Sequence, residues 1–268
     1  MREKTILDVR AAKHIGGKPK NEDCIYVPTY PGVIPGKVSE EKYSFKMNLL
    51  RHGAVFAVAD GISSGGGGGV ASYAAVEAIH NCHGQHCPAH DESIEELCDN
   101  LNNATITALQ NNGFEMGGTT IALAWFCGSK AMVSNIGDSP VYLYRQGQLQ
   151  LLSRPHTLAA LKEHRGIATI NEADNHTLYH YLGNPDYTGA EQAYINNIDI
   201  QDGDIFLLCS DGLFDLYDED ELPQMLESSA SAEEIIEMRV ALAEDNVSLI
   251  IIKVTREKTE SGTTKYYN

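Results

Sequence analysis

Residues 55–72 read Val-Phe-Ala-Val-Ala-Asp-Gly-Ile-Ser-Ser-Gly-Gly-Gly-Gly-Gly-Val-Ala-Ser, and this stretch decides the fold. Val55 to Ala59 is an apolar run long enough for a buried strand, and Asp60-Gly61 ends it with a carboxylate and a flexible residue. Five glycines then precede a helical pattern from Val70 to His80. A glycine loop before a helix can bind phosphate, but the Lys-Ser/Thr ending and the GxGxxG spacing are both missing. We therefore interpret Asp60 as a metal ligand at a sheet edge.

Composition limits the class of protein. The 268 residues are 43% hydrophobic and carry a formal net charge of -17, which fits one large domain with a substantial core. The negative charge argues against nucleic acid or an anionic membrane surface as the main partner. No apolar run reaches the length of a membrane span, and the N-terminus lacks the apolar region of a signal peptide. We predict a single domain over residues 1–268, soluble and cytoplasmic, with a flexible tail after about residue 255.

The cysteines predict a reducing compartment. Cys127 and Cys209 lie in apolar strand-like runs and are expected to be buried free thiols. The stretch from His80 to His90 also holds Cys82 and Cys87, but its spacing is not a regular zinc pattern. A polar connection between helices is the simpler interpretation of this stretch, and a zinc site is the alternative.

Strands and helices occur in separate runs along the chain. Helical periodicity is found over Ser93 to Asn111, near Glu219 to Glu227 and over Ala232 to Ala243. Strand-like runs cover 5–10, 24–27, 55–59, 119–126, 131–136, 141–145, 149–152, 204–209 and 247–254. This segregation favours an α+β layered fold over a doubly wound sheet.

The connections between these runs vary in character. The four runs between Thr119 and Leu152 are joined by turns too short for helical crossovers, which predicts a meander of antiparallel hairpins. Residues 28–51 are rich in Pro, Gly and charge and are expected to form an irregular connection or a hairpin insertion. Residues 156–197 are mixed and polar, with one helix expected at Leu158 to His164.

Acidic residues recur at the ends or starts of the apolar strands. They are Asp23, Asp60, Asp138, Asp211 and Asp245. Each alone would be an ordinary turn or cap residue, but five at strand edges favour a shared site. Carboxylate oxygens without His or Cys beside them suit Mg²⁺ or Mn²⁺. Two such ions sharing a carboxylate can activate a bridging water and bind a phosphoryl oxygen, so the pattern predicts hydrolysis of a phosphate ester.

Six motifs, taken in order, resemble the PPM-type (type 2C) metal-dependent Ser/Thr protein phosphatases, most closely their bacterial branch. They are Asn21-Glu22-Asp23, Val58-Ala59-Asp60-Gly61, Gly117-Gly118-Thr119-Thr120, Asn135-Ile136-Gly137-Asp138-Ser139, Leu208-Cys209-Ser210-Asp211-Gly212-Leu213-Phe214-Asp215 and Asp245-Asn246-Val247-Ser248. The resemblance implies a four-layer α-β-β-α sandwich, with two antiparallel sheets flanked by helix pairs. It also implies in-line attack of a metal-bridged water on phosphoserine or phosphothreonine, without a phosphoenzyme.

The same resemblance implies which residues form the catalytic set. Asp60 would bridge two ions, Mn²⁺ or Mg²⁺, and the Gly61 carbonyl would contribute to one of them. Asp211 and Asp245 would complete the ligands of the first ion, which makes Asp60, Asp211 and Asp245 the predicted catalytic residues.

Further metal-binding roles follow from the resemblance. Glu22 would hold the second ion through water, with Asp23 in the same network. Asp138 and Asp211 match a third and weaker metal site, for which Asp215 is an additional candidate.

Two positions depart from the family pattern. Lys18 stands where an arginine usually binds the substrate phosphate, and lysine keeps the charge but lacks the bidentate fork. Lys20 is a neighbouring candidate, and a solvated lysine is the alternative interpretation. The histidine that can protonate the leaving alkoxide is missing from residues 62–69. Water or another histidine would replace it, with three candidates: His52, His156 and His176.

Three functions remain in view. The leading prediction is a monomeric Ser/Thr protein phosphatase acting on phosphorylated proteins and opposing a Ser/Thr kinase. The alternatives are a phosphatase for small phosphoesters and a degenerate domain that binds a phosphoprotein or partner without hydrolysis. The flap-like region from Leu158 to Gly183 aligns poorly with the family but is expected to contact the substrate, so substrate choice is expected to lie there.

Overall fold

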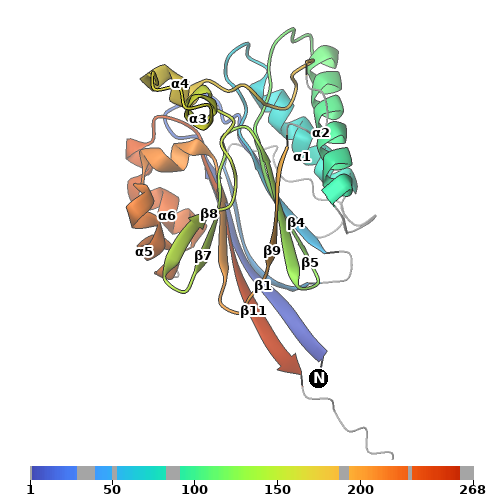
Figure 1. Ribbon diagram of the computed structural model, residues 1–268, viewed down its shortest axis with the longest axis vertical. Helices are drawn as coiled ribbons and strands as arrows, with labels where there is room; N and C mark the ends of the chain where they lie inside the picture. The colour runs from blue at the N-terminus through green and yellow to red at the C-terminus, as the bar shows by residue number, and fades with distance from the viewer. Residues whose placement is uncertain are drawn as a thin grey trace, which may run out of the picture.

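The computed structural model describes residues 2–28, 40–49, 53–82, 91–186, 193–228 and 231–259. Two antiparallel sheets pack face to face, with helices on their outer faces (Figure 1). The first sheet has the order β3-β1-β11-β10-β7-β8 and the second the order β2-β4-β5-β6-β9. The predicted α+β sandwich is confirmed. None of the helices in the described ranges is both long and apolar enough to span a bilayer.

The elements of the first sheet and its helices come mainly from the two ends of the chain. The strands are β1 (Arg2–His14), β3 (Glu41–Asn48), β7 (Val141–Arg145), β8 (Gln148–Leu151), β10 (Ile205–Cys209) and β11 (Val247–Thr259). Helices α5 (Leu222–Glu227) and α6 (Ala232–Arg239) cover its outer face.

The second sheet is built from the middle of the chain. Its strands are β2 (Cys24–Tyr26), β4 (Ala54–Ala59), β5 (Ile121–Cys127), β6 (Lys130–Ile136) and β9 (Tyr194–Asp199). Helices α1 (Gly68–Cys82) and α2 (Asp91–Asn111) cover its outer face, as the two helical patterns predicted. Two short helices, α3 (Leu158–His164) and α4 (Glu172–His176), lie near one end of the sandwich (Figure 1).

Burial on both faces explains why the decisive strand is a continuous apolar run. In β4, Phe56 and Val58 face the core between the sheets, while Val55 and Ala57 face α1 and α2. The Phe126 ring meets Phe206 of the first sheet edge-on at 4.9 Å, which joins the two sheets, and meets Phe56 of its own sheet at 5.7 Å. A central strand of such a sandwich has no solvent-exposed side, so it does not alternate apolar and polar residues.

Several sequence-based expectations need correction. The four central strands are not one meander: β5 and β6 pair in the second sheet, and β7 and β8 pair in the first. Residues 28–51 include a regular edge strand, β3, in which buried and exposed positions alternate. The polar strand β9 and the short helix α4 were not predicted, because neither has a clear apolar period. The tail is ordered as β11 up to Thr259, four residues beyond the expected end.

The cysteine prediction is half right. Cys209 is a buried free thiol. Cys127 is disulfide-bonded, so the expectation of a free thiol there was wrong. Most of the His80 to His90 stretch lies outside the described residues.

Candidate metal centre

The five strand-edge aspartates come together at one end of the sandwich. Asp60 follows β4 and Asp138 follows β6, whereas Asp211 follows β10 and Asp245 precedes β11. Cys24 pairs with Ala59, so Asp23 and Asp60 lie side by side at the edge of the second sheet. Because adjacent antiparallel strands run in opposite directions, the end of one strand and the start of the next meet at the same edge.

Backbone contacts fix the turn that carries Asp60. Its N–H donates to Thr120 Oγ1 at 3.1 Å, and its carbonyl accepts from Thr120 N–H and Thr119 Oγ1, both at 2.8 Å. Gly61 and Gly68 lie in close backbone contact. A Cβ on Gly61 would lie 2.6 Å from the carbonyl carbon of Gly68, and a Cβ on Gly68 would lie 2.7 Å from the carbonyl oxygen of Ile62. The Gly-Gly-Thr-Thr motif and the glycine loop therefore position Asp60. The loop is an ordered close approach of backbone to backbone.

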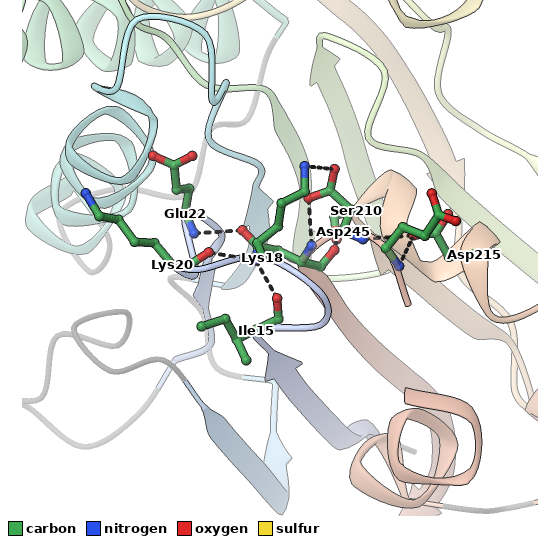
Figure 2. Close-up of polar contacts among 9 residues, drawn as sticks. Ile15, Lys18, Lys20, Glu22, Ser210, Asp215 and Asp245 are labelled. Atoms are coloured by element: carbon green, nitrogen blue, oxygen red, sulfur yellow. Dashed lines mark hydrogen bonds and ion pairs between the residues drawn. The ribbon is translucent and has the colours of Figure 1, made fainter. Parts of the chain in front are cut away.

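Asn246 joins the N-terminal loop to the start of β11. Its side chain accepts from Glu22 N–H at 2.8 Å and donates to the carbonyls of Ile15 at 2.8 Å and Lys20 at 2.9 Å. Figure 2 shows these contacts around Lys18 and Asp245. Gly212 packs against the same strand start, where a Cβ would lie 2.0 Å from the Asn246 carbonyl oxygen. Asn246 therefore has a structural role, which its place in the Asp245-Asn246-Val247-Ser248 motif did not predict.

Asp215 positions the chain beside the cluster. Its Oδ2 accepts from the N–H groups of Glu244 and Asp245, each at 3.0 Å. A single 3₁₀ turn, Asp211–Asp215, carries both Asp211 and Asp215, so the latter holds the loop that presents Asp245. The role of Asp215 at a third metal site stays a prediction.

Burial and, after it, mutual repulsion raise the pKa values of the carboxylates in the site. Removal from water and then the charges of Asp23, Asp211 and Asp138 raise the pKa of Asp60 well above its usual range. The pKa of Asp138 is raised to about 7, first by removal from water and then by Asp211. The pKa of Asp211 is also raised, first by removal from water and then by the charges of Asp245 and Asp215. Several carboxylates in one place raise one another's pKa when no cation balances them.

Asp23 is the most deeply buried member. Only 1% of it is exposed, and neither carboxylate oxygen has a hydrogen-bond partner among the described residues. The Ser248 and Ser210 hydroxyls lie near and oppose the increase, but burial still raises the pKa of Asp23 to about 6. Lys13 is bonded to the Asp23 carbonyl at 2.9 Å and not to its carboxylate.

The donor set fits Mg²⁺ or Mn²⁺, which bind carboxylate oxygens. The buried oxygens of Asp23 and the repelling carboxylates around Asp60 are the features that a divalent cation would stabilise. The spacing is not preformed: within the described ranges, no group of three or more His, Cys, Asp or Glu side chains is arranged to hold a metal ion as it stands. Lys18 gives one reason, because its Nζ lies 2.8 Å from Asp245 Oδ2.

The two candidate phosphate-binding lysines, Lys18 and Lys20, differ in where their side chains lie. Lys18 lines the cleft, and its pKa is raised by the hydrogen bond to Asp245 and by the charges of Asp211 and Asp60. The Lys20 side chain points away from Asp245 (Figure 2), so only its carbonyl takes part in the loop contacts. Glu22 packs against Gly69 and contacts Asn246 through its backbone, so its metal role also stays a prediction.

The three candidate general-acid histidines also differ in position. His156 is 4% exposed and its Nδ1 accepts from Gly137 N–H at 3.1 Å. Burial lowers the pKa of His156 to about 4, so this imidazole is neutral and supports the turn before Asp138. His176 is exposed at the end of α4 and lines the cleft, where it slightly opposes the increase in the pKa of Asp138 and Asp211. His52 lies outside the described residues.

A cleft of about 600 Å³ lies at this end of the sandwich. Its lining includes Lys18, Asp138, His176, Asp211 and Asp245. The cleft opens where the ends of both sheets meet α4, so it presents several carboxylates and two basic groups to one bound molecule.

The fold and the cleft define a two-sheet α-β-β-α sandwich with a carboxylate site at the strand ends. The chain belongs to the protein phosphatase 2C family, whose model matches residues 42–245.

Relatives agree with this assignment. The chain is 29% identical over 154 residues to serine/threonine phosphatase stp of Listeria monocytogenes serotype 4b, a match that covers 54% of this chain and 59% of that relative. It is also 29% identical over 213 residues to PstP of Mycobacterium tuberculosis, covering 75% of this chain and 40% of PstP. The chain thus spans less than two thirds of the length of these curated relatives.

Solved structures share the fold. The catalytic domain of PstP in complex with two manganese ions superimposes with a TM-score of 0.73 at 22% identity, over 94% of this chain and 99% of that domain. PppA of Pseudomonas aeruginosa superimposes with a TM-score of 0.68 at 21% identity, over 94% of this chain and all of PppA (100%).

Proposed function

We propose that this chain is a metal-dependent protein phosphatase that hydrolyses phosphoserine and phosphothreonine. The observation that carries the proposal is the meeting of Asp138, Asp211 and Asp245, from both sheets, around one cleft that Lys18 also lines. Asp60 lies next to this cleft, where it interacts with Asp211 and Asp138. Membership of the protein phosphatase 2C family and the names of the matching phosphatases support it.

The metal-binding roles form part of the proposal. Mn²⁺ or Mg²⁺ would be held by the catalytic set Asp60, Asp211 and Asp245, by the Gly61 carbonyl, and by Glu22 and Asp23 nearby, with Asp138 and Asp215 near a third ion. When bound, two such ions would supply an activated water molecule and neutralise charge on the phosphoryl group.

The side chains of the cleft then position the substrate. Lys18, which lies among carboxylates, attracts the phosphate oxygens as a point charge and releases Asp245 when it does so. His176 stands at the edge of the cleft and donates a proton to the leaving alkoxide. Thr120 and Asp215 hold the two turns that carry Asp60 and Asp245. Positioning and charge neutralisation supply most of the catalysis in phosphoryl transfer.

The proposal extends to the cellular role. The substrates would be the protein products of a Ser/Thr kinase, and the chain would act as a cytoplasmic monomer in signalling. The free thiol of Cys209 supports a reducing compartment, whereas the disulfide bond of Cys127 does not.

The test is hydrolysis of p-nitrophenyl phosphate and of a phosphothreonine peptide with Mn²⁺, with Mg²⁺ and with chelator. We expect turnover of both substrates with either ion and none with chelator. Turnover of the aryl phosphate alone would replace the proposal with a small-phosphoester hydrolase. Absence of turnover while Mn²⁺ is bound would replace it with a phosphoprotein-binding module.

A further inference from the structure

A second pocket, of about 450 Å³, lies beside the carboxylate cleft. The two share Pro155 in their walls. Three separate segments build this pocket: the connection after β8, the end of α3, and residues 179–180. Its polar lining residues are Arg154, His164, Arg165, Tyr179 and His180, and none of the described residues that line it is acidic. We call it the basic pocket.

The basic pocket is unusual because the chain has 37 acidic residues against 20 Lys and Arg. Arg10, Arg145 and Arg239 each form an ion pair with a carboxylate. By contrast, the side chains of Arg154 and Arg165 form no hydrogen bond or ion pair within the described ranges, and both line this pocket. Among the described residues, these two arginines therefore have no acidic partner, and both are available to an anion from outside the chain.

The position of Arg154 is fixed by the motif that carries Asp138. Buried Asn135 donates to the Arg154 carbonyl at 2.8 Å and accepts from the Arg154 N–H at 3.0 Å. His156, two residues on, donates its N–H to the Gly137 carbonyl at 3.0 Å. The segment that carries Arg154 therefore runs beside the Gly137-Asp138 turn, which places the basic pocket at a fixed position next to the cleft.

The other side of the pocket is also ordered. The rings of Tyr179 and His180 lie 4.4 Å apart, and that of His156 lies 5.5 Å from Tyr179 and 5.3 Å from His180. Burial lowers the pKa of His156, and the nearby His180 and Arg154 act in the same direction. Cations at the C-terminus of a helix can simply stabilise its dipole, which would explain His164 and Arg165 on α3. It does not explain Arg154 and His180, which come from other segments.

We propose that the basic pocket binds a second oxyanion, a phosphoryl or carboxylate group, on the protein segment whose phosphoresidue occupies the cleft. This inference rests on the proposed function and narrows its substrate class to segments that are phosphorylated or acidic near the scissile phosphate. Arginine suits the task because its planar guanidinium binds phosphate and carboxylate oxygens through paired hydrogen bonds.

The test uses the full chain with Mn²⁺ and a set of phosphothreonine peptides. Each peptide carries phosphoserine, glutamate or serine at one position, from one to six residues on either side of the phosphothreonine. We expect kcat/KM to be about tenfold higher for the best phosphoserine position than for its serine counterpart, mainly through KM, as expected for charge-assisted hydrogen bonds. Glutamate at that position should give a smaller gain, and this arm distinguishes a phosphoryl from a carboxylate ligand.

Substitutions in the basic pocket test whether it causes the preference for the phosphoserine peptide. The ratio of kcat/KM between the phosphoserine and serine peptides should fall to near 1 in Arg154→Gln and in Arg165→Gln. Lys130→Gln removes one charge from the turn at the opposite end of the second sheet, and it should keep the native ratio. A ratio near 1 at every position in the native chain, or an unchanged ratio in both arginine variants, would overturn the inference.

Failure of the proposed function would look different. In that case none of the phosphothreonine peptides would be hydrolysed, and fluorescence anisotropy with the labelled peptides would replace kinetics as the test of the pocket. Tighter binding of the phosphoserine peptide, lost in Arg154→Gln, would support the pocket. Equal binding of both peptides would overturn it.

Discussion

The carboxylate cleft and the basic pocket share a wall at Pro155 but differ in charge and in origin. The cleft takes its aspartates from the ends of strands in both sheets, whereas the basic pocket takes its arginines from connecting segments. Strand ends are held by the two ladders and by the core, so they suit chemistry that needs fixed geometry. Connections can change without disturbing the sheets, so they suit selection among substrates. Under the proposed function, the strand ends would carry out the reaction and the adjacent loops would select the substrate.

The carboxylate cleft and the basic pocket also differ in their effect on the stability of the folded protein. The carboxylates are removed from water and raise one another's pKa, so the metal-free cleft is destabilising. Arg154 and Arg165 remain exposed to water, so their charges cost little. Changes in the cleft should therefore affect stability and activity together, and changes in the basic pocket should affect peptide selection.

The largest effect is expected for Asp60→Asn. Loss of the proposed bridging carboxylate should lower the metal-dependent rate by a factor on the order of 10³. The same change should raise the thermal midpoint of the metal-free protein by a few degrees, because it removes a charge from a repelling cluster. Steady-state kinetics and calorimetry in chelator measure the two effects. Asp220→Asn, at an exposed site away from the cleft, is the matched control, and equal behaviour of the two variants would contradict the cleft assignment.

The two described histidine candidates should behave in opposite ways. His156→Ala should destabilise the protein by about 3 kcal/mol, because it opens a cavity and leaves the Gly137 N–H without its acceptor. His176→Ala should leave stability within about 0.5 kcal/mol. It should lower kcat for a phosphothreonine peptide by roughly tenfold or more, with a smaller effect on p-nitrophenyl phosphate, whose leaving group needs no acid. Equal losses on both substrates would remove His176 from the proton-transfer role.

The raised pKa values predict an unusual pH dependence for the metal-free protein. The folded chain holds protons on Asp23 up to about pH 6 and on Asp138 up to about pH 7, whereas an ordinary aspartate has a pKa of 3.8. Since the folded state binds more protons than the unfolded state in this window, the free energy of unfolding should fall as pH rises from about 4 to 7. The lowered pKa of His156 acts in the opposite direction, but the carboxylates outnumber it.

Denaturant titrations in chelator at several pH values measure this slope. Asp138→Asn should remove roughly 2 kcal/mol of the decrease. Mn²⁺ should also remove much of it, because a bound cation favours the ionised carboxylates. A free energy of unfolding that rises through this pH range would show that these carboxylates do not repel one another in the folded chain.

The smallest effect is expected at Lys18. Its ion pair with Asp245 is half exposed, so Lys18→Met should change stability by less than about 1 kcal/mol. The KM for phosphorylated substrates should rise several-fold in this variant. Lys18→Arg should lower KM below the native value, because a guanidinium binds phosphate in a bidentate manner. If KM is the same in all three proteins, Lys18 does not contact the phosphate.

The sequence predicted the cleft better than the basic pocket. Asp60, Asp138 and Asp211 each follow a buried strand. The pattern is clearest in β4 and β10, which hold no polar residue because both faces are buried, and it is weaker in β6, which includes Ser134 and Asn135. The segment from Arg154 to Gly183 has only short helices, and α4 has no apolar period. Its arginines and histidines meet through tertiary contacts such as Asn135 with Arg154, which no local pattern reveals. The ion pair of Lys18 with Asp245 likewise depends on a loop and a strand start that are far apart in the chain.

The most direct test of the central claim is a calorimetric titration of Mn²⁺ into the chelator-stripped chain and into Asp211→Asn. The claim is that the strand-end carboxylates are a divalent metal site and not merely a set of turn residues. The account predicts at least two Mn²⁺ ions bound per native chain and a weaker or smaller uptake in the variant. A native chain that binds no Mn²⁺, or a variant that binds it as the native chain does, would contradict the account.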